Sequence, residues 1–338
     1  MNNKEDNGLI NKLVDMYAPE NSKDVFRQIL STVIKLGKDE TVRKGDLKLI
    51  NHAFKEFSTA FSIFSKYQTK RKVAIFGSAR TKDNAPEYQM ARKFSEEIVK
   101  LGFMVITGAG GGIMKAGNEG AGTDNSFGVN IKLPFEQIPN SFIRNDPKCI
   151  TFKYFFARKL TFIKESDATV LFPGGFGTLD EAYESLTLFQ TGKCRPRPII
   201  MIEPEDSCFW DEWLHFFKKN LIGNSLVSEH DISLFSHHKR VEDAVQEIKD
   251  FYRVYNSMRY VGKNTILYLT KPVNNDIINE IKHRFSDILV DDKIELVLEE
   301  DGLDRENIWA SIPYLSFRFN RKDFGRLNEM IRFINKSV

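Results

Sequence analysis

Residues 168–186 read ATVLFPGGFGTLDEAYESL and contain three features in succession. An apolar run from Ala168 to Phe172 has the length and composition of a buried strand. A turn with three glycines follows within residues 174–177, and Thr178 then opens a sequence with helical character. A buried strand that passes through a glycine turn directly into a helix is typical of a parallel sheet covered by helices.

The same alternation extends on both sides of this stretch. Upstream, KVAIFGSAR (72–80) and FMVITGAGGG (103–112) are strand-like runs that end in glycine, and an amphipathic helix is expected over residues 85–102 between them. Further strands are expected over 126–133 and 197–202, and helices over 154–166 and 208–221. The pattern predicts an α/β fold with a Rossmann-like, doubly wound parallel sheet, whose ligands lie at the carboxyl ends of the strands.

The two ends of the chain have a different rhythm. Residues 1–70 show apolar positions at helical spacing, which predicts an N-terminal helical extension. After residue 256 the pattern becomes strand, helix, strand, strand, helix, which predicts a small C-terminal α+β appendage. The expected domains are therefore 1–70, helical extension; 71–256, Rossmann-like domain; and 257–338, appendage.

Composition limits the classes of function. The 338 residues are 41% hydrophobic and 28% charged, with a net charge of +3, as in a soluble globular protein without a concentrated basic face. We therefore expect no nucleic-acid partner. The N-terminus lacks the pattern of a signal peptide, and no apolar run reaches membrane-spanning length, so a cytoplasmic protein without membrane association is expected.

Cysteine and histidine give no sign of a metal site. The three cysteines are not closely spaced, and the six histidines form no HExxH pattern. His237 and His238 are neighbours, which point in opposite directions on a strand and suit a surface better than a metal. We expect no metal ligands.

The glycine turn is a candidate phosphate site. Gly174, Gly175 and Gly177 let a ligand approach the main chain at the positive end of a helix, and Thr178 adds a hydroxyl donor. The turn has neither the GxGxxG spacing of a dinucleotide fold nor the Gly-Lys-Ser/Thr of a P-loop. The alternative is a tight turn with a threonine cap.

Two charged residues stand near this turn. Glu181 lies three residues after Thr178, on a side that can face the same crevice, and suits a ligand with a cationic or oxocarbenium-like centre. Arg158 interrupts an apolar helix just before the strand, where a guanidinium can pair with Glu181 or hold a ligand. The alternatives are an acidic residue favoured by the helix dipole and a surface salt bridge.

At this point the residues resemble a known family. FFARKLTFIKESDATVLFPGGFGTLDEAYESLTLFQTGK (155–193) closely resembles the LOG family, the cytokinin riboside 5′-monophosphate phosphoribohydrolases once named lysine decarboxylases. FGSAR, TGAGGGIMKAGNEGA and GVNIKLPFEQIPN resemble the same family in the same order, so that the likeness covers roughly residues 72–255. The flanking segments resemble, in layout only, larger bacterial nucleotide 5′-monophosphate nucleosidases.

The resemblance implies an enzyme that hydrolyses the N-glycosidic bond of a nucleoside 5′-monophosphate to free base and ribose 5-phosphate, without a cofactor. It implies Arg158 and Glu181 as the catalytic pair and the glycine–Thr178 turn as the holder of the 5′-phosphate. A homo-oligomer, a dimer or larger, is implied as well. Further substrate contacts are expected from residues around these motifs: Lys159, Ser78, Arg80, Gly110 and Gly112. For Ser78 and Arg80 the alternative is a capped turn and a surface arginine.

Departures from the family pattern lie in the second glycine turn. Ala109 stands where relatives often have glycine, and its methyl group is expected to narrow the approach of a ligand. Lys115 stands where relatives often have glutamate, and adds positive charge beside the turn. Both changes bear on the choice of base.

Two other functions remain open. The same pocket would serve a non-catalytic nucleotide-binding or sensing module, although a pure sensor has no need of the carboxylate. A lysine decarboxylase needs a lysine that carries a cofactor, and no such motif is visible.

Overall fold

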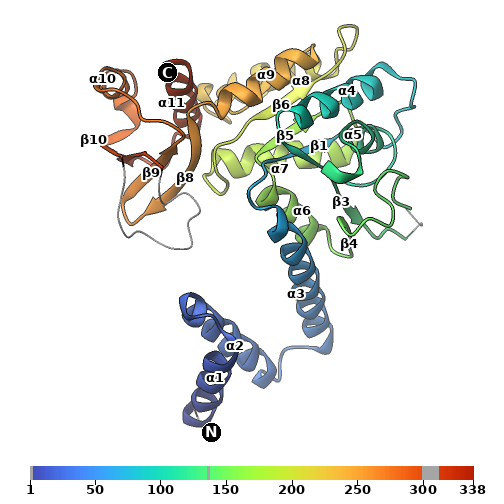
Figure 1. Cartoon of the computed structure of the whole chain (residues 1–338), viewed down its shortest axis with the longest axis vertical. Helices are drawn as coiled ribbons and strands as arrows, with labels where there is room; N and C mark the ends of the chain where they lie inside the picture. The colour runs from blue at the N-terminus through green and yellow to red at the C-terminus, as the bar shows by residue number, and fades with distance from the viewer. Residues whose placement is uncertain (1–2, 135–137, 299–311) are drawn as a thin grey trace. The chain divides into compact units, whose positions relative to one another are not determined.

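The computed structural model describes residues 3–134, 138–298 and 312–338, with side chains from residue 6 onward. The chain divides into two compact units, Met1–Ser58 and Thr59–Val338. Figure 1 shows the two units along the chain. They are described separately below.

The first unit is helical. It contains α1 (Asn3–Tyr17), α2 (Lys23–Lys38) and most of α3 (Lys44–Phe64). Helices α1 and α2 contact each other, and Lys38 forms an ion pair with Asp6 across the contact.

The second unit is built on a seven-stranded sheet in the order β4-β3-β2-β1-β5-β6-β7, and every neighbouring pair is parallel. The strands are β1 (Lys72–Phe76), β2 (Met104–Thr107), β3 (Ser126–Ile131), β4 (Cys149–Phe152), β5 (Ala168–Leu171), β6 (Ile199–Ile202) and β7 (Ser236–His238). The expected Rossmann-like parallel sheet is confirmed.

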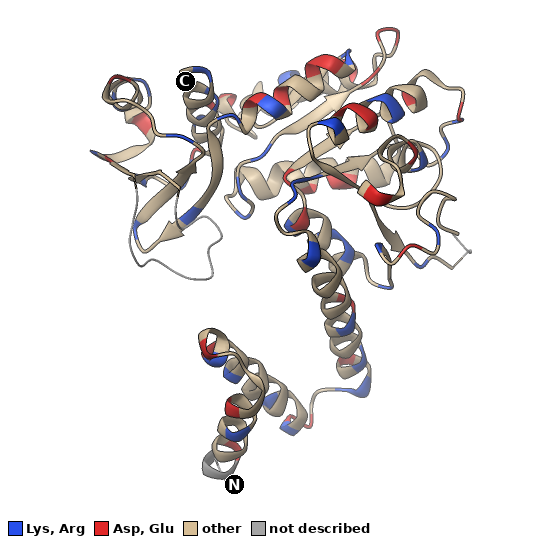
Figure 2. Ribbon diagram, viewed as in Figure 1, with Lys and Arg blue, Asp and Glu red and all other residues tan. Residues whose placement is uncertain are grey.

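Helices alternate with these strands. They are α4 (Pro86–Lys100), α5 (Ile113–Ala121), α6 (Phe155–Glu165), α7 (Phe176–Gln190), α8 (Phe209–Phe216) and α9 (Val241–Phe251). Helix α8 continues as a π-helix over Phe217–Ile222, and a 3₁₀ segment covers Glu229–Leu234. Figure 2 shows acidic and basic stretches mixed along the helices of this unit.

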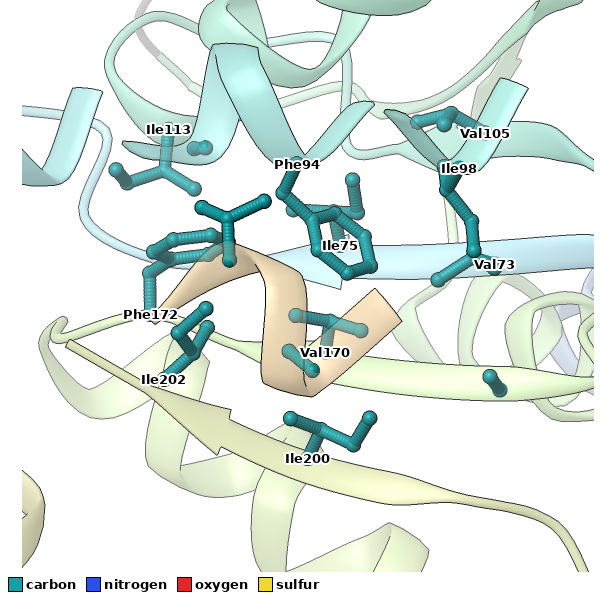
Figure 3. Close-up of a cluster of buried hydrophobic side chains, with 14 of the residues drawn as sticks. Val73, Ile75, Phe94, Ile98, Val105, Ile113, Val170, Phe172, Ile200 and Ile202 are labelled. Carbon is teal, nitrogen blue, oxygen red and sulfur yellow. The ribbon is translucent and has the colours of Figure 1, made fainter. Parts of the chain in front are cut away.

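The two faces of β1 explain how the layers form. Successive strand residues point to opposite faces, so Val73 and Ile75 face the side covered by α4 and α5, where they pack with Phe94 and Ile98 (Figure 3). Phe76 faces the other side, and its ring lies 4.7 Å from that of Phe162 in α6. Central strands of this kind carry nearly continuous apolar runs because both faces are buried.

The end of the chain forms a four-stranded antiparallel sheet in the order β10-β11-β9-β8. Its elements are β8 (Tyr255–Val261), β9 (Asn264–Leu269), α10 (Asn275–Arg284), β10 (Leu289–Val297), β11 (Tyr314–Phe319) and α11 (Phe324–Lys336). The expected small α+β element is therefore present. Helix α11 contacts α9 and α7 of the larger sheet's layers.

Among the described residues, no helix is both long and apolar enough to cross a membrane. The three cysteines are all free thiols.

Candidate active site

The glycine turns meet at the point where the strand order of the sheet reverses. Strands β1 and β5 are neighbours, and the chain continues from β1 toward β2 on one side and from β5 toward β6 on the other. A parallel sheet leaves a crevice at such a point, outside the carboxyl ends of its strands. A cleft of about 680 Å³ opens here, lined by residues 76–80 at the end of β1, residues 175–181 at the start of α7, and Met114, Phe155 and Arg158 among others.

The loops around the cleft interlock through Ser78. Its backbone N–H donates to the carbonyl of Pro173 (3.1 Å), and its carbonyl accepts from the N–H of Ile113 (3.0 Å). Two glycines make this contact possible. A Cβ at Gly174 would lie 2.2 Å from the Thr178 hydroxyl, and a Cβ at Gly112, whose φ is +58°, would lie 2.1 Å from the Ser78 carbonyl. Both positions therefore need glycine for packing alone.

Gly175 and Gly177 differ from Gly174. Both line the cleft. A Cβ built at either position would have no neighbouring atom of the described residues within 4 Å, apart from adjacent residues and the helix's own backbone. Helix α7 begins between them, at Phe176, and its first N–H groups have no partner within the helix. An anion in the cleft can thus approach these groups and the positive end of the helix dipole.

Thr178 and Glu181 lie on the same side of α7, as the spacing predicted. Both line the cleft, and both are 5% exposed. Burial raises the pKa of the Glu181 carboxyl to about 7, although the positive charges of Lys159 and Arg158 act in the opposite direction. Gly175, Gly177 and the first N–H groups of α7 form a candidate anion cradle, and a carboxyl group with a pKa near neutrality one helical turn beyond it is the most distinctive feature of the cleft.

Arg158 enters the cleft from α6. Its Nε donates to the carbonyl of Val129 in β3 at 2.9 Å, which fixes the guanidinium. A Cβ at Gly108 would lie 2.5 Å from Nη2 of Arg158 and 2.6 Å from the sulfur of Met114, so the absence of a side chain at Gly108 gives the guanidinium its space. Sequence reasoning did not single out Gly108 for this role.

Lys159 is not among the residues that line the cleft. Its ammonium lies 2.8 Å from Glu184, 3.0 Å from Asp180 and 3.9 Å from Glu181. Burial alone would lower the pKa of Lys159, but the hydrogen bonds to Glu184 and Asp180 outweigh burial, and the net shift is upward. This geometry makes Lys159 a partner of the acidic face of α7, and its contact with a substrate stays a prediction.

The remaining predicted contacts divide into two groups. Ser78 and Arg80 line the cleft, and the Ser78 hydroxyl accepts from the Arg80 N–H at 3.1 Å, as in a capped turn. Gly110 and Gly112 are buried and do not line the cleft. The Gly110 carbonyl accepts from the Asn140 side chain at 3.0 Å.

The second glycine turn is held by a network of buried polar side chains that the sequence did not predict. The Thr107 hydroxyl donates to Asn118 Oδ1 (2.7 Å), and the Asn140 side-chain amide donates to that same oxygen (3.0 Å). The Thr107 hydroxyl also accepts from the N–H of Ala109 (3.0 Å). No local sequence signal announces such a network, because its members come from β2, α5 and the loop before β4.

Ala109 and Lys115, the two residues that depart from the family pattern, do not have the expected effects. Ala109 is fully buried with φ +60°, and its methyl group lies 3.0 Å from the position a Cβ would take at Gly128 in β3. The methyl group therefore points into the core, and the expected narrowing of the ligand approach is wrong. Lys115 forms an ion pair with Asp83 at 2.5 Å, which offsets the charge it brings.

One group of side chains has the composition of a metal site. Within the described part of the chain, Glu203, Asp211 and His237 place ligand atoms within 4.8 Å of one another. The ammonium of Lys239 lies 2.9 Å from Glu203 and 2.6 Å from Asp211 and supplies a cation to the same carboxylates. Glu203 also accepts from the N–H groups of Trp210 and Asp211 at the start of α8, so this cluster has a structural explanation.

Part of the chain matches a known protein family. Residues 111–248 match the family model described as possible lysine decarboxylase, the older name of the LOG family. This segment, less than half of the chain, matches the model of the family that the sequence resembles. It contains α6, the glycine turn and α7, and thus most of the cleft. No curated protein sequence matches the chain.

Solved structures resemble the same part of the chain. The structural-genomics target TM1055 is 19% identical with a TM-score of 0.38, and covers 53% of this chain and 98% of its own. A molybdenum cofactor carrier protein from Chlamydomonas reinhardtii is 18% identical (TM-score 0.34; 53% and 96% covered). DNA processing protein A from Streptococcus pneumoniae is 12% identical (TM-score 0.35; 53% and 62% covered). Similarities of this size carry no information on activity.

Proposed function

We propose that this protein hydrolyses the N-glycosidic bond of nucleoside 5′-monophosphates, releasing the free base and ribose 5-phosphate. One observation carries the proposal: Glu181, a buried carboxyl group with a pKa near 7, lies one helical turn beyond an anion cradle at the start of α7. A phosphate in the cradle would place a ribose beside that carboxylate.

The chemistry needs few groups. The bond between C1′ and the base nitrogen breaks, positive charge develops on the ribose, and a water oxygen bonds to C1′ while the water proton neutralises the leaving base. An ionised Glu181 stabilises the oxocarbenium-like centre and accepts hydrogen bonds from ribose hydroxyls or water. Arg158 donates to the substrate and helps keep Glu181 ionised. Binding of the phosphate supplies energy that positions the sugar.

Turnover of a nucleotide panel tests the proposal. Purified protein is incubated with AMP, GMP, CMP, UMP and a cytokinin nucleotide, and free base and ribose 5-phosphate are separated by chromatography. Nucleosides without the 5′-phosphate serve as the substrate control. We expect base release from at least one nucleotide and much slower release from the matching nucleoside.

Two matched variants locate the chemistry. Glu181→Gln is expected to lower kcat by roughly 100-fold or more, the usual effect of removing a group that stabilises developing charge. Glu184→Gln removes the same charge one turn further along α7, at a residue that contacts Lys159 but does not line the cleft. Equal activity of the two variants would refute the role of Glu181.

A nucleotide-binding module without turnover is the second candidate. It is favoured by the packing of α7, because this helix begins at the proposed cradle and ends against α11. A nucleotide bound at the cradle would therefore contact a helix that reaches the C-terminal element. A Cβ at Gly192, just after α7, would lie 2.0 Å from the ring of Phe324. Saturable nucleotide binding with no base release from the panel would select this function over hydrolysis.

The decarboxylase alternative finds no support at Lys159. A lysine that forms a Schiff base must lose its proton, and the carboxylates around Lys159 raise its pKa after burial is taken into account. The homo-oligomer implied by the family resemblance also stays a proposal, which light scattering on purified protein would test.

A further inference from the structure

A second polar cavity lies at the opposite end of the strands from the cleft, where β1, β5 and β6 begin. Its volume is about 40 Å³, enough for a few water-sized groups. Its lining includes residues just before these strands and residues of the segment that joins α9 to β8. The charged and aromatic members are Arg71, Asp167, Arg195, Arg197, Tyr252 and Tyr255.

Arg197 is the unusual member of this lining, because it is only 3% exposed. Its Nη1 donates to the carbonyls of Ile163 (3.1 Å) and Ser166 (2.9 Å) and to the Ser166 hydroxyl (2.7 Å). These acceptors are all neutral. The Nε and Nη2 atoms are buried and have no hydrogen-bond partner among the described residues.

The unpartnered atoms are the pair that binds oxyanions best. In a guanidinium group, the N–H bonds of Nε and of one terminal nitrogen run parallel and can grip two oxygens of one carboxylate or phosphate. The hydroxyls of Tyr252 and Tyr255 donate to the carbonyls of Asp167 (2.5 Å) and Pro196 (3.2 Å), and neither accepts from Nε or Nη2 of Arg197.

The charges around the cavity do not balance. Among the described residues that line it are three guanidinium groups and a single carboxylate, that of Asp167. Asp167 is already engaged, because it lies 3.2 Å from Arg71 and accepts from the N–H of Lys72 at 2.9 Å. A buried charge without a counter-ion is costly, so the arrangement calls for an anion from solution.

We propose that this cavity is an oxyanion-binding site, separate from the cleft, in which the free edge of Arg197 grips two oxygens of a phosphoryl or carboxylate group. Arg71 and Arg195 supply further positive charge. The small volume fits one such group, free or at the end of a larger molecule. The proposal does not depend on hydrolysis of nucleotides in the cleft.

The site has a direct connection to the cleft. Through Ile163 and Ser166, Arg197 holds the C-terminal end of α6, the helix whose earlier turns carry Arg158 and Lys159. An anion bound to Arg197 would therefore lie next to the C-terminal end of that helix.

Calorimetric titration with inorganic phosphate, sulfate and acetate tests the proposal on the full chain. Chloride at equal ionic strength is the reference. The Gly177→Ala variant is used throughout, because its methyl group would enter the cleft and is expected to weaken binding of phosphate there. We expect saturable binding of about one anion per chain by at least one of the three. Binding of phosphate and sulfate alone assigns a phosphoryl group, and binding of acetate assigns a carboxylate.

Three further substitutions locate this binding. Arg197→Lys keeps the charge but loses the paired donors, and Arg195→Gln removes an exposed cation of the lining. Each is expected to weaken binding about tenfold or more, the usual effect of losing a charge-assisted hydrogen bond. Lys193→Gln removes an exposed cation two residues away, outside the lining, and should change nothing. No saturable binding in the Gly177→Ala protein, or binding unaffected by both arginine substitutions, would overturn the proposal.

Discussion

The ammonium of Lys159 lies 3.9 Å from Oε2 of Glu181, but only 2.8 Å from Glu184 and 3.0 Å from Asp180. The lysine thus lies closest to the two more exposed carboxylates, although its charge still acts to lower the pKa of Glu181. Burial nevertheless dominates at Glu181 and raises its pKa to about 7. The protein keeps a carboxyl group in the cleft whose charge is costly in the folded state.

Glu181→Gln should therefore stabilise the protein at alkaline pH. The folded-state pKa of Glu181 exceeds its ordinary value of 4.5, so the folded protein binds the proton more tightly than the unfolded chain does. The free energy of unfolding therefore decreases as pH rises from about 4.5 to about 7, and the full decrease persists above that range. By this linkage, the substitution should raise the free energy of unfolding by up to about 3 kcal/mol at pH 9.

Urea unfolding at pH 5 and at pH 9 measures this effect. The gain from Glu181→Gln should fall to less than about 1 kcal/mol at pH 5, where the carboxyl group is mostly protonated in the folded state. Glu184→Gln is the control, because Glu184 pairs with the same lysine at 2.8 Å and should gain no stability at pH 9. A stability gain of equal size at both pH values would contradict the linkage.

The rate of base release should rise with pH through about 7. If the ionised carboxylate stabilises the transition state, kcat/KM follows the ionisation of Glu181 in the free protein. Lys159→Met removes a charge that lowers this pKa, so the rising limb should move to higher pH. Lys164→Met, an exposed position on the same helix, should leave the limb in place. A pH profile unchanged by Lys159→Met would exclude Glu181 as its origin.

The central part of the fold could be predicted from the sequence because its strands are buried on both faces. The run Val73–Phe76 is continuously apolar and Ala168–Leu171 is interrupted only by Thr169, and the glycines after them mark the turns at the cleft. Strand β4 (Cys149–Phe152) was missed. It is short and lies at the edge of the sheet, with Thr151 exposed, so its pattern does not stand out.

The candidate site was readable only in part. The spacing of Thr178 and Glu181 fixes a shared face on any helix, and the structure places both in the cleft. The environment of Arg197 was not readable, since its partners Ile163 and Ser166 are more than thirty residues away in sequence. Its stretch, RPIIMI, was interpreted simply as a strand. Similarly, the role of Gly108 depends on a guanidinium from α6.

The glycines of the cradle should respond differently to alanine. Gly177→Ala meets open space and replaces glycine within a helix, so stability should hold or rise by up to about 1 kcal/mol. Its methyl group would occupy the cleft, and nucleotide affinity should fall about tenfold or more. Gly174→Ala forces a Cβ against the Thr178 hydroxyl and should cost about 1–3 kcal/mol of stability. Thermal unfolding and calorimetric titration with AMP separate the two effects, and equal affinity of Gly177→Ala and wild type would rule out a phosphate at this turn.

Asn335 should be critical for attaching the C-terminal helix to the parallel-sheet core. Its side-chain oxygen accepts from the N–H groups of Val254 and Tyr255, both at 2.9 Å, and its amide donates to the carbonyl of Phe251 at 2.6 Å. The side chain is 2% exposed, so Asn335→Ala leaves buried backbone groups without partners. We expect a loss of about 2–4 kcal/mol in urea unfolding. Lys336→Ala, at the exposed neighbouring position, should cost less than about 0.5 kcal/mol. Similar losses for the two variants would show that the helix is held by its apolar contacts and not by this amide.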